Sequence, residues 1–87
     1  MARSFDERFP KRNRAVFRAL AANVKRLRDE RGLKQDELAA VLGSPPAVIS
    51  HVENCRANLT LETLDDLATA LGVRPAELLN GRPRSRR

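Results

Sequence analysis

Two side chains that could take part in nucleophilic chemistry, His51 and Cys55, lie four residues apart. On one helix this spacing would bring both to the same face, where an imidazole can activate a thiol. The sequence offers no third group to orient the imidazole and no oxyanion donor, and two ligands at this spacing do not make a zinc site. We therefore interpret Cys55 as a small residue near a helix end. We expect no enzymatic activity, no metal site and no cofactor.

The charges of the chain gather at its two ends. Residues 1–31 carry ten basic and four acidic side chains, residues 32–81 carry three and seven, and residues 82–87 add four arginines, for a net charge of +6. Basic arms suit a polyanion such as DNA, because each phosphate contact releases counterions. Arg-rich ends can also simply keep a small protein soluble. We favour an N-terminal arm that contacts a duplex through Lys11, Arg12 and Arg14, and a solvated C-terminal tail.

Length and composition indicate a single all-α domain. The chain has 87 residues, of which 41% are hydrophobic. Leu and Ala, which favour helix, are abundant, and clusters of β-branched residues are scarce. A single Cys makes no intramolecular disulfide. The apolar stretch at residues 15–24 is interrupted by Arg18 and Asn23 and is too short for a signal peptide or a membrane span. We therefore expect a cytoplasmic protein that has no membrane partner.

The spacing of apolar residues predicts five helices. The first carries an apolar stripe from Phe17 to Leu27 and ends at Arg31, with a start either after a short turn or near Pro10. The others are predicted at Gln35 to Leu42, Pro46 to about Asn54, Leu61 to Leu71 after the cap Thr60, and a short segment around residues 73–79. The predicted divisions are an arm at 1–14, a helical domain at 15–81 and a disordered tail at 82–87.

The second and third predicted helices are joined by a tight turn. Gly43 permits this turn, Ala39 is small enough for a close helix crossing, and Ile49 and Val52 point inward. The other side of the third helix carries Ala47, Ser50, His51 and Asn54. This layout is typical of a helix-turn-helix, whose second helix enters the major groove of DNA, although a plain helical hairpin has the same spacing.

A wider set of residues resembles one protein family. The set comprises residues 26–32 (RLRDERG), 35–39 (QDELA), Leu42-Gly43, 49–54 (ISHVEN), 58–64 (NLTLETL), Leu67-Ala68 and 70–73 (ALGV). Over about residues 16–80 the chain resembles the phage Cro and cI repressors, also called the xenobiotic-response-element family. The resemblance implies a five-helix, lambda-repressor-like DNA-binding domain. The implied function is sequence-selective binding of double-stranded DNA by a small transcriptional regulator, most simply a repressor.

The same resemblance implies roles for single residues. Gln35 matches a glutamine that contacts phosphate at a helix N-terminus. Pro46, Ala47 and Ser50 match positions that meet base edges, whereas Asn54, Arg56 and Asn58 match positions that contact the DNA backbone. His51 is expected to contact the groove or a phosphate. Glu53 matches a structural glutamate and is left outside the site.

The chain departs from the family pattern at three places. Ser44 replaces an apolar turn residue, Pro45 and Pro46 open the recognition helix where polar readers are common, and Cys55 replaces the usual terminating Gly. Prolines have no N–H and no polar side chain with which to read a base, so base readout would fall to Ser50, His51 and Arg56, with DNA shape and the arms contributing more. The alternative is a protein-interaction module that retains the fold, such as an antitoxin or an anti-regulator.

One such module contacts few bases, so we expect a homodimer on a palindromic operator. Val73, Leu78 and Leu79 could form the dimer surface, or the two leucines could complete the core of the monomer. Phage, restriction–modification and toxin–antitoxin contexts all fit the sequence, and a protein partner such as a toxin or a co-regulator is compatible with it.

Overall fold

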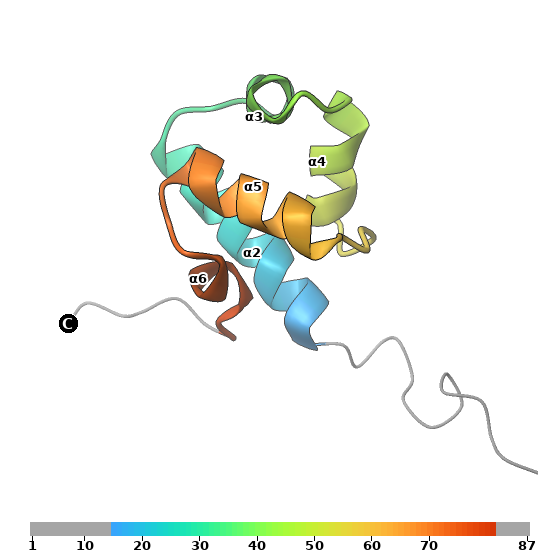
Figure 1. Ribbon diagram of the computed structural model, residues 1–87, viewed down its shortest axis with the longest axis vertical. Helices are drawn as coiled ribbons and strands as arrows, with labels where there is room; N and C mark the ends of the chain where they lie inside the picture. Colours follow the sequence, from blue (N-terminus) through green and yellow to red (C-terminus); the bar gives the residue numbers. More distant parts are fainter. Residues whose placement is uncertain (1–14, 82–87) are drawn as a thin grey trace, which may run out of the picture.

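The computed structural model describes residues 15–81, which form five α-helices and no strand (Figure 1). In chain order these are α2 (Ala15–Glu30), α3 (Gln35–Leu42), α4 (Pro46–Glu53), α5 (Leu61–Leu71) and α6 (Pro75–Leu79). The predicted all-α fold with five helices is confirmed, and the predicted helix ends within the described residues agree with the observed ones to within two residues. The predicted arm with Lys11, Arg12 and Arg14, the alternative helix start near Pro10, and the tail 82–87 lie outside the described residues.

The long helix α2 forms the base against which the others pack. Its apolar stripe contacts α4, α5 and α6, and α5 crosses directly in front of it in Figure 1. The core is built from apolar side chains that recur at helical spacing on all five helices: Leu20, Val24, Leu27, Leu38, Ala39, Ile49, Val52, Leu64, Leu67, Ala68, Leu71 and Leu78. Burial of this continuous cluster holds α3 and α4 in a fixed orientation on α2 and α5.

The last helix is tied to the first by a buried amide. Asn23 is only 1% exposed, and its Nδ2 lies 3.2, 3.0 and 3.1 Å from the carbonyl oxygens of Glu77, Leu78 and Asn80. These carbonyls end α6 without a following helical turn, so the amide supplies the donors they need. From the sequence Asn23 is visible only as an interruption of an apolar stretch.

The structure decides between the two roles left open for the leucines of the last helix. Leu78 is 0% exposed and belongs to the core of the single chain, whereas Leu79 is 37% exposed and Val73 packs partly against the core. Leu78 therefore completes the monomer, and a dimer surface that uses this side chain is ruled out by its burial.

Candidate nucleic-acid interface

The turn between α3 and α4 is set by Gly43 and the prolines. Gly43 has φ +69°, the left-handed conformation that favours glycine, and the next N–H, of Ser44, donates to the Ala39 carbonyl at 3.0 Å. Pro45 is extended (φ −65°, ψ 149°) and Pro46 is the first residue of α4. Ala39 is completely buried, as its proposed role at a close helix crossing requires. These residues build a helix-turn-helix from α3 and α4.

The outward side of α4 is exposed, as predicted. Ile49 and Val52 are buried on the inner side. Pro46, Ala47, His51 and Asn54 are exposed and Ser50 is half-buried. None of these outward residues carries a carboxylate, so this side of the helix presents no negative charge to a polyanion.

The loop after α4 begins with an unusual backbone conformation at Cys55. Its φ is +62°, the one positive value at a residue other than glycine in the described part of the chain. Two bonds close the helix in the manner of a Schellman motif: Cys55 N–H to the Val52 carbonyl at 3.1 Å, and Arg56 N–H to the His51 carbonyl at 2.8 Å. Cys55 thus takes the place of a terminating glycine, as the sequence suggested, and it lies outside the helix that carries His51.

Beyond Cys55 the loop alternates between exposed polar and partly buried apolar side chains. Arg56 and Asn58 are exposed, whereas Ala57 and Leu59 pack against the core. The apolar pair anchors the loop, so that Arg56 and Asn58 project from a fixed segment next to the end of α4.

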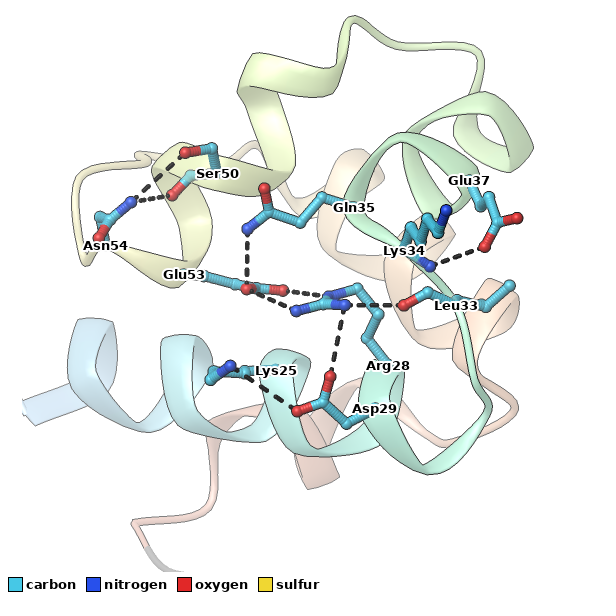
Figure 2. A network of polar contacts seen from close by, with 10 residues as sticks. All are labelled: Lys25, Arg28, Asp29, Leu33, Lys34, Gln35, Glu37, Ser50, Glu53 and Asn54. Carbon is cyan, nitrogen blue, oxygen red and sulfur yellow. Dashed lines mark hydrogen bonds and ion pairs between the residues drawn. The ribbon is translucent and has the colours of Figure 1, made fainter.

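A hydrogen-bonded network joins the end of α4 to α2 and to the start of α3 (Figure 2). Arg28 donates to Glu53 from Nε at 2.7 Å and from Nη2 at 3.1 Å, and its Nη1 donates to the Leu33 carbonyl at 2.7 Å. Gln35 donates from Nε2 to Glu53 Oε1 at 3.0 Å. The bidentate pair fixes both side chains in one geometry. It also neutralises the single carboxylate of α4 on the inner side of the helix.

The network shifts the ionisation of its charged members. Burial raises the pKa of the Glu53 carboxyl, but hydrogen bonds from Arg28 and Gln35 and the positive charge of Arg28 outweigh burial and leave this pKa below its ordinary value. The hydrogen bond to Glu53 likewise raises the pKa of Arg28. Both groups are therefore charged at neutral pH, which agrees with the structural role expected for Glu53.

Gln35 is the first residue of α3 and is half-buried. One hydrogen of its amide is used by Glu53, which fixes the side chain, and the second remains for another acceptor. At the same end of α3, the Lys34 N–H is occupied by Glu37 Oε1 at 2.7 Å. The sequence pointed to Gln35 and to Glu53 separately, and it gave no sign that they bond to each other.

Asn54 also has a partner that the sequence did not reveal. Its Nδ2 donates to the Ser50 carbonyl at 2.8 Å and approaches Ser50 Oγ at 3.4 Å (Figure 2). Ser50, expected at base edges, and Asn54, expected at the DNA backbone, are therefore hydrogen-bonded to each other at the end of α4.

Ser44, the first departure from the family pattern, has a buried Oγ for which the described residues offer no hydrogen-bond partner. The hydroxyl is therefore tolerated in the turn at a cost, since a buried polar group without a partner destabilises the folded state.

Two surfaces away from α4 differ from it in character. Glu62, Asp65 and Asp66 are exposed on α5 and make that helix face acidic. An apolar groove is bordered by Val16, Leu59, Leu61 and Leu79, and Leu61 is 83% exposed there. Among residues 15–81 no three potential metal ligands cluster together, and no helix is long and apolar enough to cross a membrane.

Comparison with known proteins agrees with this geometry. The family model for helix-turn-helix domains of the HTH_3 type matches residues 24–78, and the chain belongs to this family. Its fold is therefore that of a helix-turn-helix transcriptional regulator.

Individual relatives cover most of the described helices. The chain is 43% identical over 60 residues to an uncharacterized HTH-type transcriptional regulator, y4dJ, of Sinorhizobium fredii. The aligned segment covers 69% of this chain and 78% of the relative. Two crystal structures are similar. The hypothetical transcription factor NHTF from Neisseria has a TM-score of 0.72 at 35% identity, over 75% of this chain and 73% of that one. The restriction-modification controller protein C.AhdI from Aeromonas hydrophila has a TM-score of 0.67 at 32% identity. The match covers 71% of this chain and 94% of that one.

Proposed function

We propose that this regulator binds double-stranded DNA sequence-selectively, with the outward side of α4 in the major groove. The observation that carries the proposal is the distribution of charge on α4. Its single carboxylate, Glu53, is bound by Arg28 on the inner side, so that the exposed side is neutral and polar. A neutral helix face can approach base edges without repulsion from the phosphates on either side of the groove. The protein acts by binding rather than catalysis, in the cytoplasm.

In this arrangement the chemistry of each residue determines which part of the DNA it contacts. Gln35 and the free N–H groups at the start of α3 hold a phosphate oxygen. Pro46 and Ala47 offer apolar contact, for instance to a thymine methyl, and Ser50 and His51 hydrogen-bond to base edges. Backbone contacts then come from Arg56, Asn58 and the basic residues Lys11, Arg12 and Arg14.

The regulator acts as a homodimer on a palindromic operator, and represses transcription by occupying it. One domain contacts too few base pairs for useful selectivity, and a two-fold dimer places its recognition helices about 34 Å apart. The apolar groove around Leu61 is the surface on which a second copy packs. Residues 57–60 of the loop after α4 line part of this groove, so pairing there brings the loops of the two copies close together.

The dimer is tested by sedimentation of two matched variants. Leu61→Lys places a charge on the groove, whereas Val41→Lys places the same charge on an apolar side chain of α3 that is also exposed but lies outside the groove. We expect the first variant to be monomeric and to bind its operator weakly, and the second to sediment as the wild type does. A Leu61→Lys protein that remains dimeric would show that the groove is not the dimer surface.

DNA binding itself is tested by selection from random duplexes, followed by affinity measurements at several salt concentrations. An enriched inverted repeat and a steep loss of affinity with salt are expected. Gln35→Ala and Ser50→Ala should weaken binding of that repeat while the fold is retained. Thr69→Ala, which removes an exposed hydroxyl on the acidic side of α5, should leave binding unchanged.

The second candidate function is binding of a protein partner, such as a toxin or a co-regulator. It is favoured by one observation: the exposed start of α4 consists of Pro46 and Ala47, which offer no side-chain hydrogen bonds to bases. Selection that enriches no sequence, together with a weak dependence of affinity on salt, would support this function over DNA binding.

A further inference from the structure

His51 is the one histidine of the chain, and it lies on the outward side of α4. Its side chain is exposed, and within residues 15–81 the imidazole forms no hydrogen bond or ion pair. A histidine changes its charge between about pH 5 and pH 8, where carboxylates stay charged and lysine and arginine stay protonated. The charge of His51 in this range therefore depends on what lies against the outward side of α4.

The charged groups around α4 are engaged elsewhere or exposed. The charged side chains that α2, α3 and the following loop place around this helix are Lys25, Arg28, Asp29, Lys34, Asp36, Glu37 and Arg56. Arg28 is bound to Glu53 on the inner side of α4, and Lys25 approaches Asp29 at 3.7 Å (Figure 2). No carboxylate among the described residues contacts the imidazole, so these residues offer no partner that would hold the ring in its charged form.

A DNA duplex against α4 would change this balance. The duplex carries about one negative charge per 1.7 Å of its axis, and a nearby negative charge favours the protonated form of a histidine. The protonated ring also has two N–H donors in place of one. Both can be used in the groove, on phosphate oxygens or on base acceptors such as guanine N7 and O6.

We infer that binding of DNA takes up a proton at His51, so that the affinity of this regulator for its operator increases as the pH falls through the neutral range. This inference rests on the proposed DNA binding. The ring titrates at higher pH in the complex than in the free protein. The gain in affinity is therefore fully present below the titration midpoint of the free protein, and it is lost as the pH rises through the midpoint of the complex. A difference of about one pH unit between the midpoints corresponds to about tenfold in affinity for each chain bound.

The first test measures affinity for the selected operator between about pH 5.5 and pH 7.5 at constant salt. We expect the wild type to lose about tenfold in affinity per bound chain over this range. His51→Gln keeps a hydrogen-bonding side chain that does not ionise, and its affinity should be the same throughout. The pKa of Glu53 lies below its ordinary value, so this carboxylate does not titrate in the range. A His51→Gln protein that retains the wild-type dependence would overturn the inference.

The second test follows the proton itself by NMR. Because the chain has one histidine, its imidazole signals need no assignment. The midpoint of their titration should be higher by about one pH unit when the operator is bound. The matched control is the double variant His51→Gln with Thr69→His, which moves the histidine to an exposed position on the acidic side of α5. Its midpoint should be the same with and without operator. A wild-type midpoint that does not rise, or that rises equally in the double variant, would overturn the inference.

Circular dichroism of each variant verifies that α4 is retained. A wild type that enriches an operator and binds it with the same affinity across the pH range would overturn the inference and leave the proposed function intact. Failure of the wild type to enrich any sequence would instead contradict the proposed function, and this inference with it.

Discussion

Glu53, at the end of α4, is bound by Arg28 of α2 through two hydrogen bonds of 2.7 and 3.1 Å. Both side chains are largely withdrawn from solvent, with 6% and 11% of their surfaces exposed. The pair connects the proposed recognition helix to the base of the fold, and Gln35 joins the same carboxylate from the start of α3. One carboxylate therefore links both helices of the helix-turn-helix to α2.

Removal of this carboxylate should destabilise the fold strongly. Glu53→Ala leaves the Arg28 guanidinium buried without its partner, and we expect a loss of about 3 kcal/mol in the free energy of unfolding. Chemical denaturation measures this loss. The double variant Arg28→Met with Glu53→Leu replaces the pair by apolar groups and should lose less than Glu53→Ala alone. An equal or larger loss in the double variant would show that the pair itself, rather than the stranded charge, supplies the stability.

The lowered pKa of Glu53 makes stability dependent on acid pH. The folded state holds this pKa below the unfolded value of about 4.3, so the carboxylate contributes stability above that value. The contribution is lost as the pH falls through the lower, folded-state pKa. We expect the melting temperature of the wild type to drop between about pH 5 and pH 3 more steeply than that of Glu53→Gln, which cannot ionise. Parallel curves for the two proteins would contradict the role given to Glu53.

The backbone at Cys55 predicts a stabilising substitution. A residue with a Cβ in the left-handed region is strained by about 1 kcal/mol, and glycine removes this strain at a smaller entropic cost. Cys55→Gly should therefore raise the free energy of unfolding by about 0.5 kcal/mol, whereas Cys55→Val, with a branched Cβ, should lower it. Thermal unfolding of the two variants checks the order. A Cys55→Gly protein less stable than the wild type would show that the thiol contributes more than its backbone costs.

The buried side-chain amide of Asn23 should contribute more to the free energy of unfolding than the amides of the exposed asparagines do. Asn23→Ala removes the donors that three carbonyls at the end of α6 share, and we expect a loss of about 2 kcal/mol. Hydrogen exchange of the α6 amides should increase at the same time, since the last helix is released from α2. Asn80→Ala is the control, because its side chain is exposed and only its main-chain carbonyl bonds to Asn23. Equal losses in both variants would refute the capping role.

The sequence predicted the helices well because each is marked locally. Apolar residues recur at helical spacing, and Gly43, Pro46 and Thr60 mark the ends by backbone chemistry that needs no distant partner. The outward side of α4 followed from the same periodicity, since Ile49 and Val52 had to face the core.

What the sequence did not reveal are contacts between residues far apart in the chain. Asn23 bonds to carbonyls more than fifty residues away, and Arg28 meets Glu53 across 25 residues. Neither pairing has a periodicity that could signal it. The link between Asn54 and Ser50 is local, but it depends on side-chain orientation at the end of the helix, which a residue pattern does not fix.

The central claim is that the outward side of α4 contacts DNA. The most direct measurement follows backbone amide chemical shifts by NMR while a selected operator duplex is titrated. We expect the largest changes at Ala47, Ser50, His51 and the loop residues Arg56 and Asn58, with the acidic side of α5 unaffected. Changes confined to α5 or to the groove around Leu61, with α4 unperturbed, would contradict the claim.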